Sequence, residues 1–230
     1  MFSQACKKVR QSLYGIIGTS IVAQVGSQSR TNVTNGTGFM VAPGYILTAA
    51  HLVHVEGNPK NAVHQQFEVI RAPDVGGRTE KAVLAAEDVI RDVALIKIDN
   101  ISRDVAALEA GILSRGESCG FLGFPLSQVT SNPGGGKNFQ LDERFQGANI
   151  SNYNIIQHPS GRKLPIYEVD TLMYGGSSGC PGFTTKGKII GMQVASVMEK
   201  NKDGQIGARV AISLVIPSPE LIEFTQANIK

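Results

Sequence analysis

Three short segments of the chain carry residue types that can perform nucleophilic chemistry together. His51 ends residues 36–51, two apolar runs around a Pro-Gly turn, and Asp92 begins an otherwise apolar run. Ser178 lies in residues 174–181, a tight Gly-rich turn that exposes backbone N–H groups. A serine nucleophile needs a base that accepts its proton, an acid that orients the base, and N–H donors aimed at the developing oxyanion. The sequence contains all three parts.

The acidic residue is informative because of the run that follows it. Asp92 opens the strand expected at residues 92–98 and can therefore be partly buried at the edge of a barrel. A buried carboxylate without a partner is destabilising, and a histidine N–H is one suitable partner. Each segment alone also fits a plainer interpretation: a structural histidine, a solvated aspartate at a strand start, and a Gly/Ser-rich linker. Their combination favours catalysis.

The same segments match, in order, the signatures of a known family. T-A-A-H at residues 48–51, D-V-A-L at 92–95 and G-S-S-G-C-P at 176–181 resemble the motifs of the chymotrypsin-like (trypsin-like) serine peptidases. The resemblance implies that His51 is the general base, Asp92 orients it and Ser178 is the nucleophile. It also implies an oxyanion hole formed by the N–H groups of Gly176 and Ser178. The expected activity is that of a serine endopeptidase that acts through an acyl-enzyme, without a metal or an organic cofactor.

A second hydrolase motif overlaps the same turn. G-x-S-x-G at residues 175–179 is the nucleophile elbow of α/β-hydrolases and would make Ser177 the nucleophile. Those enzymes carry their triad in the order Ser, acid, His, whereas every histidine of this chain precedes Ser177: His51, His54, His64 and His158. The sequence therefore excludes the elbow. Cys180 does not suggest a cysteine protease, since the thiol would have to stand at position 178.

Departures from the digestive enzymes indicate a bacterial-type branch. Ser177 replaces the Asp that pairs with a new N-terminus after zymogen cleavage, so we expect no such activation. G-F-P at residues 123–125, Y-E-V-D-T at 167–171 and I-G-M-Q at 190–193 resemble segments of HtrA-type proteases and glutamyl endopeptidases. The chain ends soon after the expected C-terminal helix, so we expect no PDZ domain. We leave two alternatives open, a protease-like domain that binds peptides or a partner without turnover, and a viral polyprotein protease.

The strand after the nucleophile should form one wall of the pocket for the residue before the cut. We expect the substrate-binding residues to be Met173, Gln193, Val194 and Ala195. Gln193 stands where glutamyl endopeptidases have a histidine, and residues 172–176 contain no acid that would receive Lys or Arg. The sequence predicts preference for a small or medium uncharged side chain.

These residues need a β scaffold. Short apolar or alternating runs between turns predict twelve antiparallel strands, and the resemblance implies an all-β fold of two six-stranded antiparallel β-barrels. We expect a barrel with the His and Asp in residues 1–110, a barrel with the nucleophile and pocket in 111–230, and an N-terminal and a C-terminal helix at 3–13 and 218–229. Residues 127–144 are polar and Gly-rich, which predicts a long mobile loop. The expected strands are residues 14–25, 37–41, 45–48, 67–71, 82–86, 92–98, 118–123, 147–157, 166–170, 180–184, 188–196 and 208–214.

The composition of the chain indicates which classes of molecule it can bind. The 230 residues carry a formal net charge of +3 that is spread along the chain, so we expect peptide or protein substrates and no nucleic acid. The sequence has no run of 18 or more apolar residues, the length that a membrane-spanning helix needs, and we expect no membrane partner. The oligomeric state stays open. Three widely spaced cysteines and an N-terminus without a continuous apolar core predict free thiols and a cytoplasmic or otherwise intracellular location.

Overall fold

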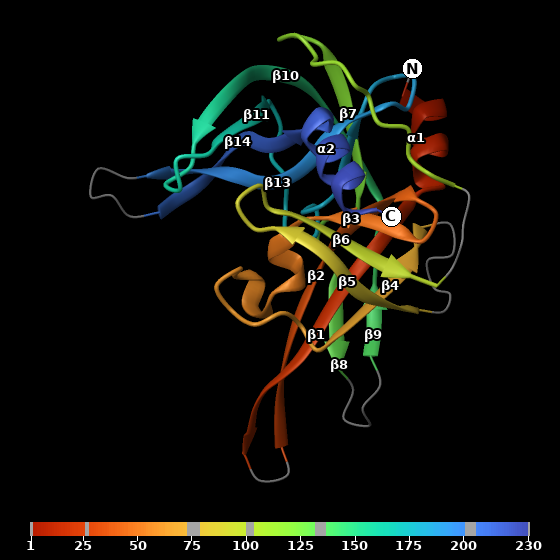
Figure 1. Ribbon diagram of the computed structural model, residues 1–230, viewed down its shortest axis with the longest axis vertical. Helices are drawn as coiled ribbons and strands as arrows, with labels where there is room; N and C mark the ends of the chain where they lie inside the picture. The colour runs from red at the N-terminus through yellow and green to blue at the C-terminus, as the bar shows by residue number, and fades with distance from the viewer. Residues whose placement is uncertain are drawn as a thin grey trace.

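A computed structural model describes residues 2–25, 28–72, 79–99, 104–131, 137–200 and 206–229, which include two closed antiparallel barrels of six strands each (Figure 1). This confirms the predicted fold class. The first barrel has the order β1-β2-β3-β6-β5-β4 and the second has the order β10-β11-β14-β13-β12-β7. The first consists of β1 (Leu13–Val25), β2 (Gln28–Ala42), β3 (Tyr45–Thr48), β4 (Gln66–Arg71), β5 (Glu80–Asp88) and β6 (Val93–Ile98). The second consists of β7 (Ser118–Gly123), β10 (Arg144–Gln157), β11 (Lys163–Val169), β12 (Pro181–Phe183), β13 (Ile189–Lys200) and β14 (Ile206–Pro217).

The alternation of side chains along β1 explains how two barrels share one core. Tyr14 and Ile16 are buried in the cluster that fills the first barrel. Leu13 and Ile17 point the other way, because successive residues of a strand face opposite sides. They join a cluster that also contains residues of the second barrel, such as Phe183. The strand therefore lies between two apolar layers, and the barrels cannot separate without exposing the shared one.

The two terminal helices connect the halves of the molecule. Helix α1 (Phe2–Arg10) buries Ala5 and Val9, and the ring of Phe2 lies 6.0 Å from that of Phe183, so the N-terminal helix packs on the second barrel. Helix α2 (Ser218–Asn228) has a proline in its first turn, where the missing N–H costs nothing. Figure 1 shows α2 in front of the junction between the barrels. Both predicted helices are confirmed, although α1 ends three residues earlier than expected. In the described residues no helix is long and apolar enough to cross a membrane.

The prediction of a loop without regular structure at residues 127–144 is wrong. Strands β8 (Gln128–Ser131) and β9 (Lys137–Gln140) pair antiparallel there, while residues 132–136 lie outside the described part. Strand pairing satisfies backbone N–H and C=O groups whatever the side chains are. An apolar alternation is needed only where a strand covers a core, and β8 and β9 belong to neither barrel.

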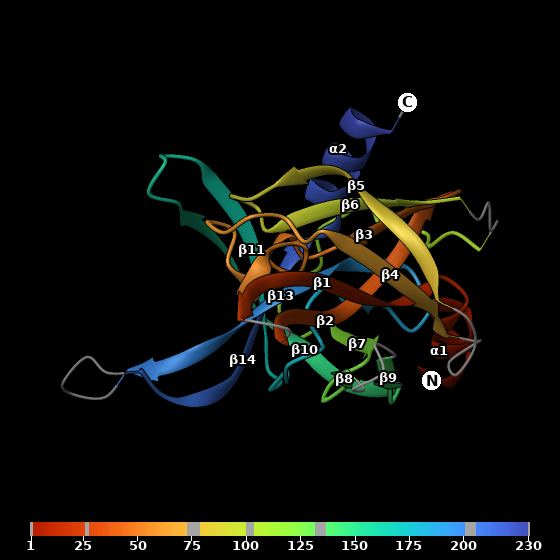
Figure 2. The ribbon, with the colours of Figure 1, turned by 90° about the horizontal axis from the view of Figure 1, so that it is seen from below.

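Residues between the barrels bond to both of them. Ala106 N–H donates to Met40 O in β2, and Ile189 N–H in β13 donates to Ala107 O. The division of the chain at residue 110 stays a prediction. Two hairpins, β1–β2 and β13–β14, extend beyond their barrels, and Figure 2 shows the second of them from below.

Candidate active site

His51 lies three residues after the end of β3, in the short 3-10 helix η1 (Ala50–Val53). Ala49 and Ala50 are fully buried, so the backbone that carries the imidazole packs directly against its neighbours. The side chain of His51 is 22% exposed. The small residues of the T-A-A-H motif thus place a partly exposed imidazole on a tightly packed backbone.

Asp92 lies one residue before β6, not in the strand as expected. Its φ of +55° is left-handed, a conformation that Asp adopts more readily than most residues. One carboxylate oxygen of Asp88 accepts hydrogen bonds from the backbone N–H groups of Ile90 and Arg91, both at 3.1 Å, and this closes the turn that leads into Asp92. The turn holds the carboxylate toward η1.

His51 and Asp92 form two hydrogen bonds. Asp92 Oδ1 accepts from the His51 backbone N–H at 2.8 Å, and Asp92 Oδ2 lies 2.8 Å from His51 Nδ1. A carboxylate only accepts hydrogen bonds, so Nδ1 carries the proton and Nε2 presents a lone pair. This is the tautomer that a general base for a serine requires.

Ser178 lies in a turn whose backbone only glycine permits. Gly176 and Gly179 have φ of +92° and +83°. A Cβ atom on Gly176 would lie 2.2 Å from Phe124 O, and one on Gly179 would lie 2.0 Å from Thr37 O. Hydrogen bonds from Ser177 N–H to Tyr174 O and from Cys180 N–H to Ser177 O close the turn.

The peptide between Gly175 and Gly176 is held in one orientation. Gly175 O accepts a 2.7 Å hydrogen bond from Leu126 N–H, and the N–H of a trans peptide points opposite to its C=O. Within the described residues, neither Gly176 N–H nor Ser178 N–H has a hydrogen-bond acceptor. Two unused donors beside a serine are suited to stabilise an oxyanion.

Thr37 of β2 joins the two halves of the site, and the sequence did not single it out. Its N–H donates to Ser178 O at 2.9 Å. Its hydroxyl donates to Gly176 O at 2.8 Å and accepts from Phe124 N–H at 3.1 Å. The signal available in the sequence was a threonine between two glycines. In the structure this threonine is fully buried.

The hydroxyl of Ser178 makes no hydrogen bond to His51 in the described part of the chain. In proteins without bound substrate, such catalytic hydrogen bonds are often long and shorten in the complex. The structure thus brings His51 and Asp92 into contact and places Ser178 on the facing barrel. The catalytic roles of the three residues stay a prediction.

A cavity of about 260 Å³ adjoins Ser178 and is lined by all four residues expected to bind substrate. None of the described residues that line it is charged. The amide Nε2 of Gln193 donates to Ala195 O at 3.1 Å, which fixes its side chain along the wall. Ser178 and Ser196 also belong to segments expected at the pocket, whereas Tyr174, Gly175 and Met198 were not predicted to line it. The lining consists of Met173, Tyr174, Gly175, Ser178, Gln193, Val194, Ala195, Ser196 and Met198.

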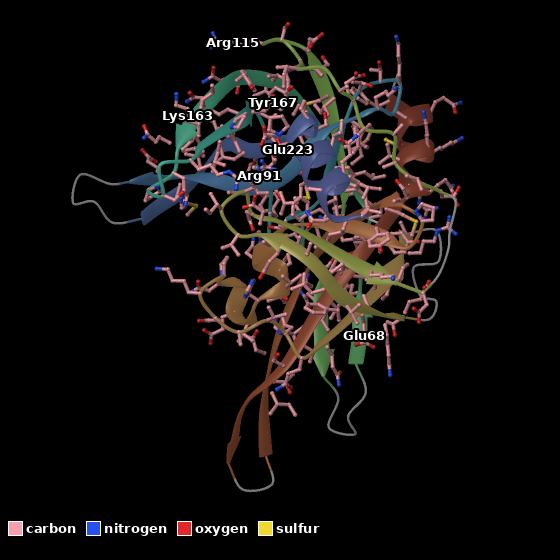
Figure 3. The ribbon with its side chains drawn as sticks, in the orientation of Figure 1. Glu68, Arg91, Arg115, Lys163, Tyr167 and Glu223 are labelled. Carbon is pink, nitrogen blue, oxygen red and sulfur yellow. The ribbon has the colours of Figure 1, made fainter. Side chains whose placement is uncertain are left out.

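The turn before Asp92 is also tied to the rest of the molecule. Arg91 is almost buried and contacts Glu223 of α2 at 2.6 Å (Figure 3) and Glu220 at 3.1 Å. Asp88 contacts Arg162, beside β11, at 2.7 Å. An ion network therefore links the Asp92 turn to the C-terminal helix and to the second barrel.

The two unused N–H donors beside Ser178 allow a prediction, on the hypothesis that they form an oxyanion hole. Gly176→Ala should lower kcat by about 10²–10³-fold, the effect of losing one oxyanion donor, because the new Cβ must push the peptide away from Phe124 O. Gly111→Ala is the matched control, since its Cβ would meet only Glu109 Oε1 at 3.9 Å. Peptidase kinetics with equal amounts of folded protein test this. Full activity in Gly176→Ala would contradict the predicted role of the Gly176 N–H.

Comparison with known proteins gives one family, a curated relative and solved structures of similar fold. Residues 36–192 match the family described as a trypsin-like peptidase domain. A curated relative from Halomonas elongata, a probable periplasmic serine endoprotease DegP-like, is 28% identical over 194 residues, which are 84% of this chain and 35% of that protein. The chain thus spans about a third of this relative's length.

Solved structures share the fold. The HtrA-type protease AlgW with a decapeptide superposes with a TM-score of 0.72 at 21% identity, over 100% of this chain and 67% of that one. A protease from M. tuberculosis in its active form gives a TM-score of 0.69 at 19% identity, over 98% of this chain and 83% of that one.

The predicted cytoplasmic or otherwise intracellular location is wrong, because the curated relative is named as a periplasmic protein. The cysteines could not identify the compartment. Burial raises the pKa of the Cys119 thiol to about 12 and also raises the pKa of Cys180. Thiols that stay protonated react slowly, so these unpaired cysteines are compatible with oxidising surroundings.

Proposed function

Because this chain belongs to the family of trypsin-like peptidase domains, we propose that it is a serine endopeptidase that cleaves peptide bonds through an acyl-enzyme on Ser178. The observation that carries the proposal is the His51–Asp92 pair with Nδ1 protonated, together with a turn that holds Ser178 beside two unused N–H donors. Peptides or proteins are the proposed substrates.

The proposed mechanism assigns a step to each group. His51 Nε2 takes the proton of Ser178 Oγ as Oγ attacks the carbonyl carbon of the substrate. The N–H groups of Gly176 and Ser178 receive the oxyanion, and Asp92 stabilises the imidazolium. His51 then donates its proton to the leaving amine, and a water molecule activated by the same imidazole hydrolyses the acyl-enzyme. The scheme uses no metal or organic cofactor.

Active-site labelling tests the proposal. A fluorophosphonate probe should modify the purified chain at one residue, which peptide mass spectrometry should identify as Ser178, and casein or a peptide library should be cleaved. Heat-unfolded protein is the control and should not be labelled. Folded protein that neither reacts nor cleaves would overturn the proposal in favour of a peptide-binding domain without turnover.

The cavity beside Ser178 predicts which side chain precedes the cut. Met173 and Val194 give it apolar walls, Ser196 adds a hydroxyl, and no described lining residue is charged. Burying an unpaired charge is costly, so uncharged residues of small or medium size should exceed Lys, Arg, Asp and Glu by at least about a hundredfold in kcat/KM. Cleavage of a library with all residues at this position measures the ratio. Preference for a charged residue would contradict the prediction.

A further inference from the structure

A second pair of side chains fastens the segment that carries His51. His54 follows η1 directly, and its N–H donates to His51 O at 3.3 Å. Its imidazole is only 5% exposed. Nδ1 lies 2.8 Å from Asn61 O, and Nε2 lies 2.7 Å from Glu87 Oε2, at the end of β5. A buried ring with both nitrogens bonded cannot rotate without losing two hydrogen bonds.

The partners of His54 define where the protons are. Asn61 O can only accept, so Nδ1 carries a proton. A second proton lies between Nε2 and the Glu87 carboxylate, because two lone pairs at 2.7 Å would repel. Both ring nitrogens of His54 therefore have protein hydrogen-bond partners and need no water molecule. His54 is also too fully occupied by these partners to act as the base of the proposed reaction.

The His54–Glu87 pair joins the same two segments as the His51–Asp92 bonds, namely η1 and the turn between β5 and β6. Glu87 and Asp92 flank the turn between β5 and β6, and Glu87 pairs with Ala94 in the sheet. His51 lies in η1, and His54 follows its last residue. The short helix is consequently attached to the turn at two places, once through Asp92 and once through Glu87. The start of η1 is held by the Asp92 side chain and by Ala50 N–H, which donates to Asp92 O at 3.2 Å, and the His54–Glu87 bond holds the end of η1.

We propose that His54 and Glu87 are positioning residues, which hold η1 so that His51 Nε2 faces Ser178; this inference rests on the proposed function. Neither residue lines the cavity beside Ser178, so substrate affinity should not depend on them. Misplacing a catalytic group by about 1 Å costs roughly a hundredfold in rate. Loss of the pair should therefore lower kcat and leave KM unchanged.

Three variants separate positioning from stability. Glu87→Ala removes the bond and should lower kcat by about tenfold to a hundredfold. Glu87→Gln can donate its amide N–H to a neutral His54 Nε2 and should restore kcat to within about threefold of the wild-type value, which is about half of the 1.4 kcal/mol that a factor of ten represents. Glu143→Ala is the matched control, because the Glu143 carboxylate is about as exposed as that of Glu87 and makes a salt bridge of the same 2.7 Å length, to Arg10.

Kinetics and NMR are measured on the same samples, with thermal unfolding as the measure of stability. In the NMR spectrum, the low-field proton of the His51 Nδ1–Asp92 bond, assigned by its loss in His51→Ala, should be sharp in the wild-type chain and in Glu87→Gln and broadened in Glu87→Ala. This NMR signal can be observed without turnover. An inactive wild-type chain would therefore overturn the proposed function, while the signal would still show whether the His54–Glu87 pair positions His51. Equal kcat in Glu87→Ala and Glu143→Ala, an unchanged proton signal, or a kcat loss in Glu87→Gln as large as in Glu87→Ala would overturn the inference.

Discussion

Ser178→Ala is expected to lower kcat by roughly a millionfold, the loss seen when the nucleophile of a triad is removed. The change leaves the cavity walls intact, so KM should move little. It also leaves the fold intact, because Ser178 is bonded in the described structure through its backbone O, which accepts from Thr37 N–H at 2.9 Å. We therefore expect the free energy of unfolding to change by less than about 0.5 kcal/mol. Single-turnover kinetics and chemical denaturation measure both quantities.

Ser177→Ala is the matched control, one residue away in the same turn. Ser177 is 2% exposed and takes part in the turn through its backbone groups. Its substitution should leave both fluorophosphonate labelling and kcat within a fewfold of the wild-type values. Labelling that survives in Ser178→Ala and disappears in Ser177→Ala would make Ser177 the nucleophile and overturn the assignment.

The parts of the site that depend on local sequence were predictable. The twelve barrel strands follow from short apolar or alternating runs, and the structure places each of them. The Gly-rich turn around Ser178 was recognisable because its two left-handed residues must be glycine. The cavity residues Met173 and Gln193 followed from the family resemblance, because they stand at positions that line the pocket in glutamyl endopeptidases.

The parts that depend on contacts between distant segments were not predictable. Thr37 bonds to Gly176, 139 positions away, and Leu126 fixes the Gly175 carbonyl. Arg91 finds its partners in α2, more than a hundred residues later. Single hydrogen bonds of this kind leave no periodic pattern in a sequence. The β8–β9 hairpin was missed for a related reason, since strands that cover no core need no apolar alternation.

Asp92→Asn is expected to lower kcat by about 10⁴-fold, although the side chain keeps its size. The amide oxygen can take the place of Oδ1 and accept from the His51 backbone N–H. The amide NH₂ then faces Nδ1, and two donors cannot bond to each other. The imidazole must move its proton to Nε2, where it blocks acceptance of the Ser178 proton. The fluorophosphonate labelling rate should fall in parallel with kcat.

The matched control is Asp142→Asn, which removes the charge of an exposed carboxylate 3.9 Å from Arg144. Its kcat should stay within about twofold of the wild-type value, as for surface changes distant from the site. The comparison isolates the cause, because both variants lose one negative charge and only one of them reverses a hydrogen bond. If Asp92→Asn kept a tenth of the wild-type kcat, the tautomer of His51 would be set by something other than Asp92, and the proposed triad would reduce to His51 and Ser178.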